Sequence, residues 1–273
     1  MNYEQTLDYL YSRLPVFHQI GSAAYKPGLE NTIRILTALH QPQNSFRSIH
    51  VAGTNGKGSV SHFLSSILQS SGYKTGLYTS PHLVDFGERI RVNGEMIDKQ
   101  FVIDFVENHK KLIEEVQPSF FEITMAMAFD YFASSKVDVA VIEVGLGGRL
   151  DSTNIIQPEL SVITNISFDH EEFLGHTLQE IATEKAGIIK PHTPVVIGEA
   201  LPETKPVFLQ KAQEMNAPIF FSENIKQIFF DRYEENRMIV KTSDEKSYAV
   251  GLTGNYQLKN IATVLTAVDQ LRK

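Results

Sequence analysis

The sequence predicts an α/β fold in which a doubly wound, mostly parallel sheet is flanked by helices. From residue 47 onward, short apolar runs alternate with amphipathic helical segments. Parallel sheets with crossover helices have this order of elements. The run VDVAVIEVG is apolar at both alternating sets of positions, as expected for a strand that is buried on both faces.

The apolar periodicity places the elements in order. Helical spacing predicts two helices, at residues 3–14 and 28–39, with the small-residue loop FHQIGSAAYKPGL between them. We then expect five strands: SIHVAG, KTGLYTS, VDVAVIEVG, LSVITNI and PVVIGE. Between and around them we expect four helices: residues 59–72, 98–116, 122–134 and 177–189.

The pattern changes near residue 220. The segment KQIFFDRYEENRMIVKTSDEKSYAVGL contains three short apolar runs joined by polar turns. This predicts a small antiparallel sheet, at about residues 220–252, appended to the main sheet. Residues 255–271 then predict a final helix, and we assign residues 1–273 to one domain.

Composition limits the class of function. The 273 residues are 42% hydrophobic and 21% charged, as in ordinary globular proteins. The net charge of −7 argues against a nucleic-acid partner, which favours a basic surface. The absence of cysteine excludes disulfides, thiolate metal sites and cysteine nucleophiles. No apolar run is long enough for a membrane span, and the first residues, MNYEQTLDYLYSRL, lack the apolar core of a signal peptide, so we expect a cytoplasmic monomer that binds no membrane.

The stretch VAGTNGKGSV at residues 51–60 raises the first functional question. It resembles a phosphate-binding loop but departs from the usual G-x-x-x-x-G-K-[ST] pattern. Val51 stands where the first glycine is expected, and Gly58 stands where serine or threonine should follow the lysine. The alternative is a glycine-rich turn that carries a solvated lysine.

The context of this stretch favours a phosphate loop. A predicted strand precedes it and a predicted helix follows it, so backbone N–H groups at the helix N-terminus can face one anion. Gly53, Gly56 and Gly58 allow the chain to turn and a ligand to approach the backbone closely. Lys57 can reach the outer phosphates, and Ser59 can contact phosphate or a metal-bound water.

Three more side chains are candidates for a site beside this loop. Glu143 ends a predicted parallel strand, where such sheets bind ligands, and its carboxylate suits Mg²⁺. Asp169 and His170 follow the next strand and reach the same edge. The alternatives are an exposed acid at the strand end and a structural histidine. Lys185 lies within a predicted helix, and the residues alone leave open whether its stem merely covers apolar surface.

Several long motifs in register resemble the folylpolyglutamate synthase and dihydrofolate synthase family, within the Mur ligase superfamily of ATP-dependent amide ligases. The motifs stand in the family's order: VAGTNGKGSV, YTSPHLVDFGERIRVNG, FFEIT, VIEVGLGGRLDSTNII, ISFDHEEFLG, EKAGIIKP and LTGNYQLKNIATVLTA. The resemblance covers roughly residues 16–270, and it implies a fold like that of P-loop nucleotide hydrolases.

The resemblance implies roles for residues of the nucleotide and metal sites. The ATP phosphates would be held by the phosphate loop: Gly53, Thr54, Asn55, Gly56, Lys57, Gly58 and Ser59. Asn260 would lie near the adenine, where Tyr256 replaces a histidine that is usual in the family. Ser80 and Glu143 would bind one Mg²⁺, and Glu143 and His170 a second. Lys185 matches a lysine that such ligases carry as a carbamate. The implied catalytic set is therefore Lys57, Glu143, His170 and Lys185.

The resemblance also implies a pocket for the pterin and aminobenzoate groups of a folate. Its implied lining comes from three segments: Phe120, Phe121 and Glu122; Leu150, Asp151 and Ser152; and Arg89, a candidate for an anionic group. Plain core packing is the alternative for the two phenylalanines, and a surface position is the alternative for the arginine.

The implied activity is ATP-dependent ligation of L-glutamate to dihydropteroate or a folate through an acyl phosphate. A Mur-type peptidoglycan ligase is the alternative enzyme, and about fifty residues before the loop leave little room for its additional N-terminal domain. The family's C-terminal domain, with its Asp-Gly-x-His-Asn segment, has no counterpart here. We therefore also consider a nucleotide-binding fragment that turns over weakly or not at all.

Overall fold

The computed structural model describes residues 1–15 and 28–272, and its contacts divide the chain into two compact units. The loop FHQIGSAAYKPGL lies largely outside the described residues. The first unit comprises Met1–Ser48, Ser65–Leu146 and Leu150–Gln157, and the second comprises Ile49–Leu64, Gly147–Arg149 and Pro158–Lys273. The assignment of residues 1–273 to one domain stays a prediction.

The strands of the first unit follow the order β4-β3-β2-β5. β2 pairs in parallel with β5, whereas β3 pairs antiparallel with both β2 and β4. Their bounds are β2 (Thr75–Tyr78), β3 (Ile90–Val92), β4 (Glu95–Met96) and β5 (Val139–Glu143). The β3–β4 hairpin was not expected, although its turn is Asn93-Gly94, the dipeptide that most strongly signals a two-residue hairpin.

Helices enclose the core of the first unit: α1 (Tyr3–Arg13), α3 (Glu30–Ala38), α5 (Lys99–Val116) and α6 (Phe120–Ser134), with the 3₁₀ turns η2 (Pro42–Asn44), η3 (Phe86–Arg89) and η4 (Ser152–Ile155). α6 carries apolar residues around most of its circumference, which is the pattern of a buried helix. Its residues Ile123, Met125 and Phe129 are fully buried. α6 thus forms the centre of this core.

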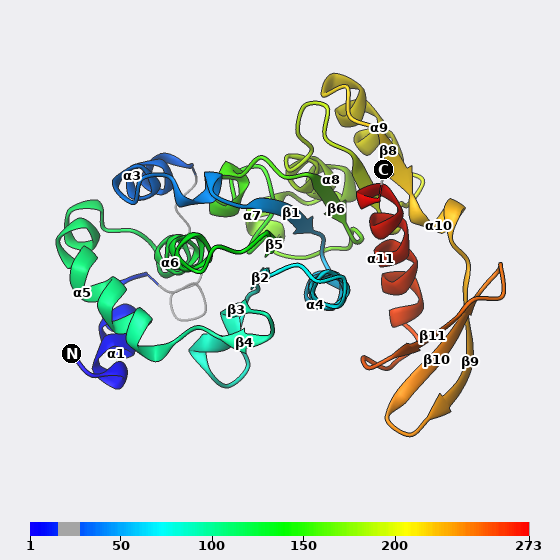
Figure 1. Cartoon of the computed structure of the whole chain (residues 1–273). Helices are drawn as coiled ribbons and strands as arrows, with labels where there is room; N and C mark the ends of the chain where they lie inside the picture. Colours follow the sequence, from blue (N-terminus) through cyan, green and yellow to red (C-terminus); the bar gives the residue numbers. More distant parts are fainter. Residues whose placement is uncertain (16–27, 273) are drawn as a thin grey trace. The chain divides into compact units, whose positions relative to one another are not determined.

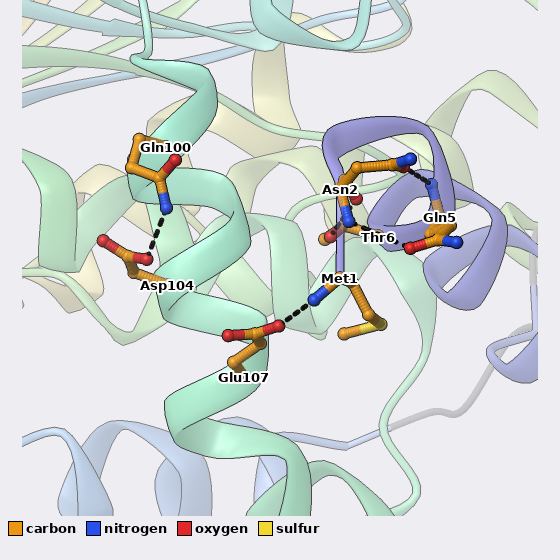
Figure 2. A network of polar contacts seen from close by, with 7 residues as sticks. All are labelled: Met1, Asn2, Gln5, Thr6, Gln100, Asp104 and Glu107. Atoms are coloured by element: carbon orange, nitrogen blue, oxygen red, sulfur yellow. Dashed lines mark hydrogen bonds and ion pairs between the residues drawn. The ribbon is translucent and has the colours of Figure 1, made fainter.

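The start of α1 is held by polar contacts that Figure 2 shows. Asn2 caps the helix by accepting from the N–H of Gln5, whose side chain accepts from the N–H of Asn2 in return. Such a reciprocal capping box satisfies N–H groups that the first turn leaves without helical partners. The N-terminal amine of Met1 forms an ion pair with Glu107 of α5.

The second unit contains the parallel strands β1-β6-β7-β8, in that order. Their bounds are β1 (Arg47–Ala52), β6 (Leu160–Ile163), β7 (Val195–Ile197) and β8 (Ile219–Phe221). The helices are α4 (Lys57–Ser70), α7 (Glu171–Leu174), α8 (Leu178–Ala186), α9 (Lys205–Glu214), α10 (Ser222–Ile225) and α11 (Gln257–Leu271). β1 and α4 each have residues in both units.

A three-stranded antiparallel sheet of the second unit has the order β11-β10-β9. Its strands are β9 (Ile228–Glu234), β10 (Arg237–Thr242) and β11 (Ser247–Val250). One face packs against α11, where Met238, Val240, Val250 and Ile261 form a buried cluster, and Figure 1 shows α11 (red) beside these strands (orange). The predicted fold class is confirmed: a mostly parallel sheet with flanking helices, plus a small antiparallel sheet.

Among the described helices, none is long and apolar enough to cross a membrane.

His50 gives the protein a pH-dependent stability. It lies on β1 with no exposed surface, and burial, together with the nearby charge of Lys190, lowers the pKa of its imidazole to about 3. The unfolded chain has the ordinary histidine pKa of about 6.5, so it binds the proton more readily. The stability that neutral His50 contributes is therefore present above pH 6.5 and is lost as the pH falls toward 3.

We expect His50 to remove about 2 kcal/mol of stability between pH 7.5 and pH 5. In the His50→Leu variant, which cannot titrate, this part of the pH dependence should disappear. Urea unfolding of both proteins at pH 7.5, 6 and 5 gives the free energy of unfolding as a function of pH, and the slopes of the two proteins are compared. Equal slopes in the two proteins would contradict the assignment.

Candidate active-site residues

The loop between β1 and α4 has the geometry of a phosphate-binding loop. Gly53 and Gly56 have positive φ angles of 142° and 85°. The Lys57 ammonium donates to the carbonyl oxygens of Gly53 at 3.0 Å and Thr54 at 3.2 Å. α4 begins at Lys57, so the N–H groups of its first turn have no helical partners and form a binding site for an anion.

Gly53 has no room for a side chain. An added Cβ would lie 1.9 Å from the Thr164 hydroxyl oxygen and 3.0 Å from the Thr164 nitrogen. We therefore expect Gly53→Ala to lower the free energy of unfolding by about 2–4 kcal/mol, because it adds a clash to a strained φ. The matched variant is Gly58→Ala, where a Cβ meets nothing within 4 Å; it should change stability by less than about 1 kcal/mol. Thermal unfolding compares the two, and equal losses would refute this explanation.

Lys185 is brought to the same loop by α8. Its side chain is buried, with 3% of the residue exposed, and its ammonium donates to the Gly53 carbonyl oxygen at 3.0 Å. Lys57 donates to that same oxygen. The sequence left open whether the Lys185 stem merely covers apolar surface. The structure shows instead that its nitrogen has a buried polar partner. The side-chain nitrogens of two lysines therefore meet at the Gly53 carbonyl oxygen.

The start of α11 also lies against the loop. The Asn260 amide contacts Gly56, since a Cβ added there would lie 2.4 Å from the Asn260 side-chain oxygen. Asn260 donates to the Gln257 amide oxygen at 2.8 Å, and Gln257 donates to the Ser59 hydroxyl at 3.1 Å. Tyr256, just before them, is 68% exposed. The predicted ATP residues of the second unit are therefore grouped around one loop.

His170 lies beyond β6 in the same unit. It precedes α7 with a left-handed backbone, φ 47°. Its imidazole lies 3.5 Å from the Asp169 carboxylate, and its side chain is 40% exposed. The residues that follow β6 contact the phosphate loop directly: the Thr54 N–H donates to the Asn165 carbonyl at 3.0 Å.

Ser80 and Glu143 come together in the first unit. Glu143 is the last residue of β5 and is 4% exposed, and its carboxylate accepts from the Ser80 N–H at 3.2 Å. This places the hydroxyl-bearing residue and the acid of the predicted metal site side by side. Both stand at the carboxyl end of a parallel strand or just beyond one, where ligands bind in such sheets.

The predicted aromatic lining is also in the first unit. The Phe121 and Tyr78 rings lie 5.9 Å apart, and a Cβ added to Gly145 would lie 2.5 Å from the Phe121 ring. Ser152 is buried and Leu150 is half-buried. The loop after β5 therefore packs against an aromatic face of α6.

Asp151 holds this loop. Its carboxylate accepts from the N–H groups of Gly145 at 3.0 Å, Leu146 at 2.9 Å and Thr153 at 2.9 Å, and from the Thr153 hydroxyl. Burial raises the pKa of the Asp151 carboxyl, and these hydrogen bonds act in the opposite direction. Four donors use the acceptor positions that a carboxylate offers, so Asp151 positions backbone.

Glu122 likewise has a local partner. It is 3% exposed, and its carboxylate accepts from the Ser119 N–H at 2.6 Å, while the Ser119 hydroxyl accepts from the Glu122 N–H. This is a capping box at the start of α6. Sequence reasoning placed Glu122 in the pocket, and the structure gives its carboxylate a helix-capping partner.

Arg89 is buried, with 5% exposed, and is packed among aromatic rings. Its guanidinium carbon lies 5.2 Å from the centre of the Phe120 ring, and its Nε donates to His82 Nδ1 at 2.6 Å. Because arginine can only donate, His82 Nδ1 accepts, and the proton of a neutral imidazole is on Nε2. Nε2 lies 3.3 Å from the Tyr11 hydroxyl. A surface position for Arg89 is therefore excluded.

The comparison with protein families decides the relationship. The sequence profile of the Mur ligase middle domain matches residues 51–268, most of the chain.

The chain belongs to the Mur ligase family.

Proteins similar to this Mur ligase chain are named dihydrofolate synthases and folylpolyglutamate synthases. It is 40% identical over 259 residues to the dihydrofolate synthase/folylpolyglutamate synthase of Bacillus subtilis, covering 91% of this chain and 60% of that protein. It matches the folylpolyglutamate synthase of Thermotoga maritima with a TM-score of 0.87 and 35% identity, covering 99% of this chain and 62% of that one. A complex of a folylpolyglutamate synthase with AMPPCP and folate matches with a TM-score of 0.86 at 35% identity, covering 99% of this chain and 67% of that one. The chain thus spans about three fifths of the first two relatives.

The predicted metal ligands of this Mur ligase chain are divided between its two units. Ser80 and Glu143 belong to the first, and His170 and Lys185 to the second. Within residues 1–15 and 28–272, no group of three or more His, Asp or Glu side chains is arranged to hold a metal. The Glu143 carboxylate and the Ser80 hydroxyl suit Mg²⁺, which takes one or two carboxylates and completes its shell with water and phosphate oxygens, whereas an imidazole is a softer ligand than this ion prefers. Ser80 and Glu143 therefore fit the ion, and the full ligand set stays a prediction.

Sequence reasoning missed three residues that the structure places beside the candidate sites: Gln257, His82 and Tyr11. Gln257 bonds to Ser59 of the phosphate loop, and His82 links Arg89 to Tyr11. His82 stands two residues after Ser80 in the motif TSPH, and Gln257 stands in YQLKN. His82 and Gln257 both lie within motifs of the family resemblance, so their places in those motifs could have indicated them. Tyr11 had none, because it reads as part of an amphipathic helix.

Proposed function

We propose that this chain is the ATP- and Mg²⁺-binding part of a ligase that joins L-glutamate to the carboxyl group of dihydropteroate or a folate. The observation that carries the proposal is the phosphate loop, in which Lys57 opens α4 beside two glycines with positive φ. The match to the Mur ligase middle domain supports it, as does the relative that was studied with AMPPCP and folate.

Lys57 and the first turn of α4 supply the positive field for the triphosphate. The ammonium already lies at the loop, where it contacts two carbonyl oxygens. Charge on the transferring phosphoryl group is the main quantity that such an enzyme must stabilise. A fixed cation and oriented N–H groups stabilise it without reorganisation during the reaction.

Ser80 and Glu143 are the residues that we propose for one Mg²⁺, and Glu143 and His170 for a second, with a carbamate on Lys185 as a further oxygen ligand. A carbamate would replace the second ammonium beside the Gly53 carbonyl with an anion. When bound, Mg²⁺ would neutralise phosphate charge. Glu143 is buried at the end of β5 and is kept in place by the Ser80 N–H.

The reaction needs no nucleophilic side chain from the protein. The substrate carboxylate attacks the γ-phosphorus of ATP, which forms an acyl phosphate and releases ADP. The amine of glutamate then attacks the acyl carbon, loses a proton, and displaces inorganic phosphate as the amide forms. The role of this chain is to bind, orient and neutralise charge.

The first unit offers the surface for the flat ring system of the substrate. The partly exposed Phe121 supplies an apolar face, with the buried Tyr78 ring behind it, and Asp151 fixes the backbone of Gly145 and Leu146 beside them. Arg89, buried against Phe120 with its Nε bonded to His82, is the group that we propose for an anionic part of the substrate. Pockets of this type combine aromatic walls with few polar groups.

Glutamate-dependent release of ADP tests the proposal. The protein that carries this sequence is incubated with ATP, Mg²⁺ and L-glutamate, and dihydropteroate and tetrahydrofolate are offered separately. We expect ADP release with at least one acceptor and none without glutamate. Release that requires a UDP-sugar acceptor would indicate a peptidoglycan ligase, and ATP binding without release in either assay would indicate a nucleotide-binding fragment.

A further inference from the structure

We propose that the segment after β6 forms a clasp that holds the phosphate loop in its binding conformation before nucleotide arrives, with Asn165 and Thr54 as its central positioning residues. The clasp is defined as the contacts of Thr54 and Asn55 with Thr164, Asn165 and Ser167. All five residues belong to the second unit. The inference rests on the proposed nucleotide binding at this loop.

Asn165 satisfies the two N–H groups at the start of the loop. Its backbone carbonyl accepts from the Thr54 N–H at 3.0 Å, and its side-chain oxygen accepts from the Asn55 N–H at 2.9 Å. These two N–H groups are thus paired within the protein. Phosphate is left to the N–H groups of the first turn of α4, which lack helical partners. Within the predicted set Gly53 to Ser59, the clasp therefore removes the Thr54 and Asn55 N–H groups from the donors that can bind phosphate.

Thr54 and Asn55 are held from their other side as well. The Thr54 hydroxyl donates to the Ser167 carbonyl at 3.2 Å and accepts from the Ser167 N–H at 3.1 Å. The Thr164 hydroxyl donates to the Asn55 carbonyl at 2.6 Å. Each of the two loop residues is therefore bonded both through its N–H group and through a second polar group.

These contacts lie at the proposed nucleotide site, so they should affect the affinity for ATP as well as the stability of the fold. A flexible loop that becomes ordered only when it binds phosphate loses conformational entropy in the binding step, which weakens affinity. The clasp orders the loop beforehand and leaves the amides of the helix end unobstructed. Its last residue, Ser167, lies two residues before the Asp169–His170 pair, so the same segment leads directly to a predicted metal ligand.

Thr54→Val tests the clasp with little change of side-chain size. It removes both hydrogen bonds with Ser167, whereas Thr54→Ser keeps the hydroxyl. The chain contains a matched control in the same unit: the Thr242 hydroxyl donates to the Lys246 carbonyl at 3.2 Å and accepts from the Lys246 N–H at 3.1 Å. Thr242→Val thus removes the same pair of bonds far along the chain from the phosphate loop.

Binding of ATP–Mg²⁺ and of adenosine is measured by calorimetry on the 273-residue chain. Loss of two neutral hydrogen bonds at the loop should weaken ATP binding by about tenfold and leave adenosine binding unchanged. Thr54→Ser should restore ATP binding to within about twofold. Thr242→Val should lower thermal stability to a similar degree as Thr54→Val but leave ATP binding unchanged.

Amide hydrogen exchange of the nucleotide-free chain gives a readout that does not depend on affinity. In Asn165→Ala, the Asn55 amide should exchange at least about tenfold faster, because its side-chain acceptor is removed, whereas the Thr54 amide keeps the backbone carbonyl of residue 165 as its partner. In Thr54→Val, both amides should exchange at least about tenfold faster, because the contacts with Ser167 that hold the loop are removed. Unchanged exchange, or equal loss of ATP and adenosine affinity in Thr54→Val, would overturn the clasp. Failure of the unaltered chain to bind ATP would instead overturn the proposed function, and the clasp's role in nucleotide binding with it.

Discussion

Replacement of Lys57 by alanine is expected to lower the rate of glutamate-dependent ADP release by a factor of about 10² to 10³. Lys57 is the cation at the start of α4, and its ammonium is held at the loop by the Gly53 and Thr54 carbonyl oxygens. The substitution removes the positive charge that would face the outer phosphates. The free energy of unfolding is not expected to change by a comparable amount, because the lysine stem is only partly buried.

Steady-state kinetics with ATP as the varied substrate checks this expectation. The control is Lys211→Ala, which removes a lysine of α9 that pairs with Glu214 at the surface; surface pairs contribute about 0–1 kcal/mol, so the rate should stay within about twofold. A Lys57→Ala enzyme that keeps more than a tenth of the activity would show that another group carries the charge stabilisation.

Glu143→Gln is expected to lower the same rate by a factor of about 10² or more, and to raise the Mg²⁺ concentration needed for half-maximal rate. Glutamine has nearly the same shape and keeps an oxygen that can accept from the Ser80 N–H. It lacks the negative charge that a hard divalent cation requires from its protein ligand. We therefore expect a loss of the Mg²⁺-dependent rate of ADP release, with little change in the free energy of unfolding.

A Mg²⁺ titration of ADP release separates these effects. The matched variant is Asp130→Asn, which neutralises a half-buried acid of α6 in the same unit, where burial raises the pKa of the carboxyl. It should leave the Mg²⁺ dependence unchanged. If Glu143→Gln keeps both the rate and the Mg²⁺ requirement of the unaltered protein, the metal assignment of Glu143 is wrong.

The periodicity of the sequence predicted most elements of both units. Strands that are buried on both faces, such as β5 and β6, give continuous apolar runs and were found at their places. The β3–β4 hairpin was missed because its strands are two or three residues long, shorter than a periodicity can register. α9 and β8 were missed because α9 carries few buried residues and β8 is only half-buried.

The candidate site was predicted unevenly, and the reason differs from residue to residue. A phosphate loop is a local structure, so the order of strand, glycines, lysine and helix was enough to indicate it. Lys185 could not be interpreted from helical spacing, because spacing does not show what covers a face; the structure buries it against Gly53. The motif of Glu122 predicts a place in the substrate pocket, which stays a prediction, and the structure shows in addition that its carboxylate caps α6.

The sequence by itself determined the fold class and indicated the position of the predicted phosphate loop, because both follow from patterns within short stretches of the chain. Only the tertiary structure decided which distant side chains share a place: Lys185 and Lys57 on one carbonyl, Asn165 on Asn55, and Gln257 on Ser59. The physical reason is that hydrogen bonds and burial depend on separation in space. Residues as far apart in the chain as Ser59 and Gln257 meet only after the strands and helices have packed.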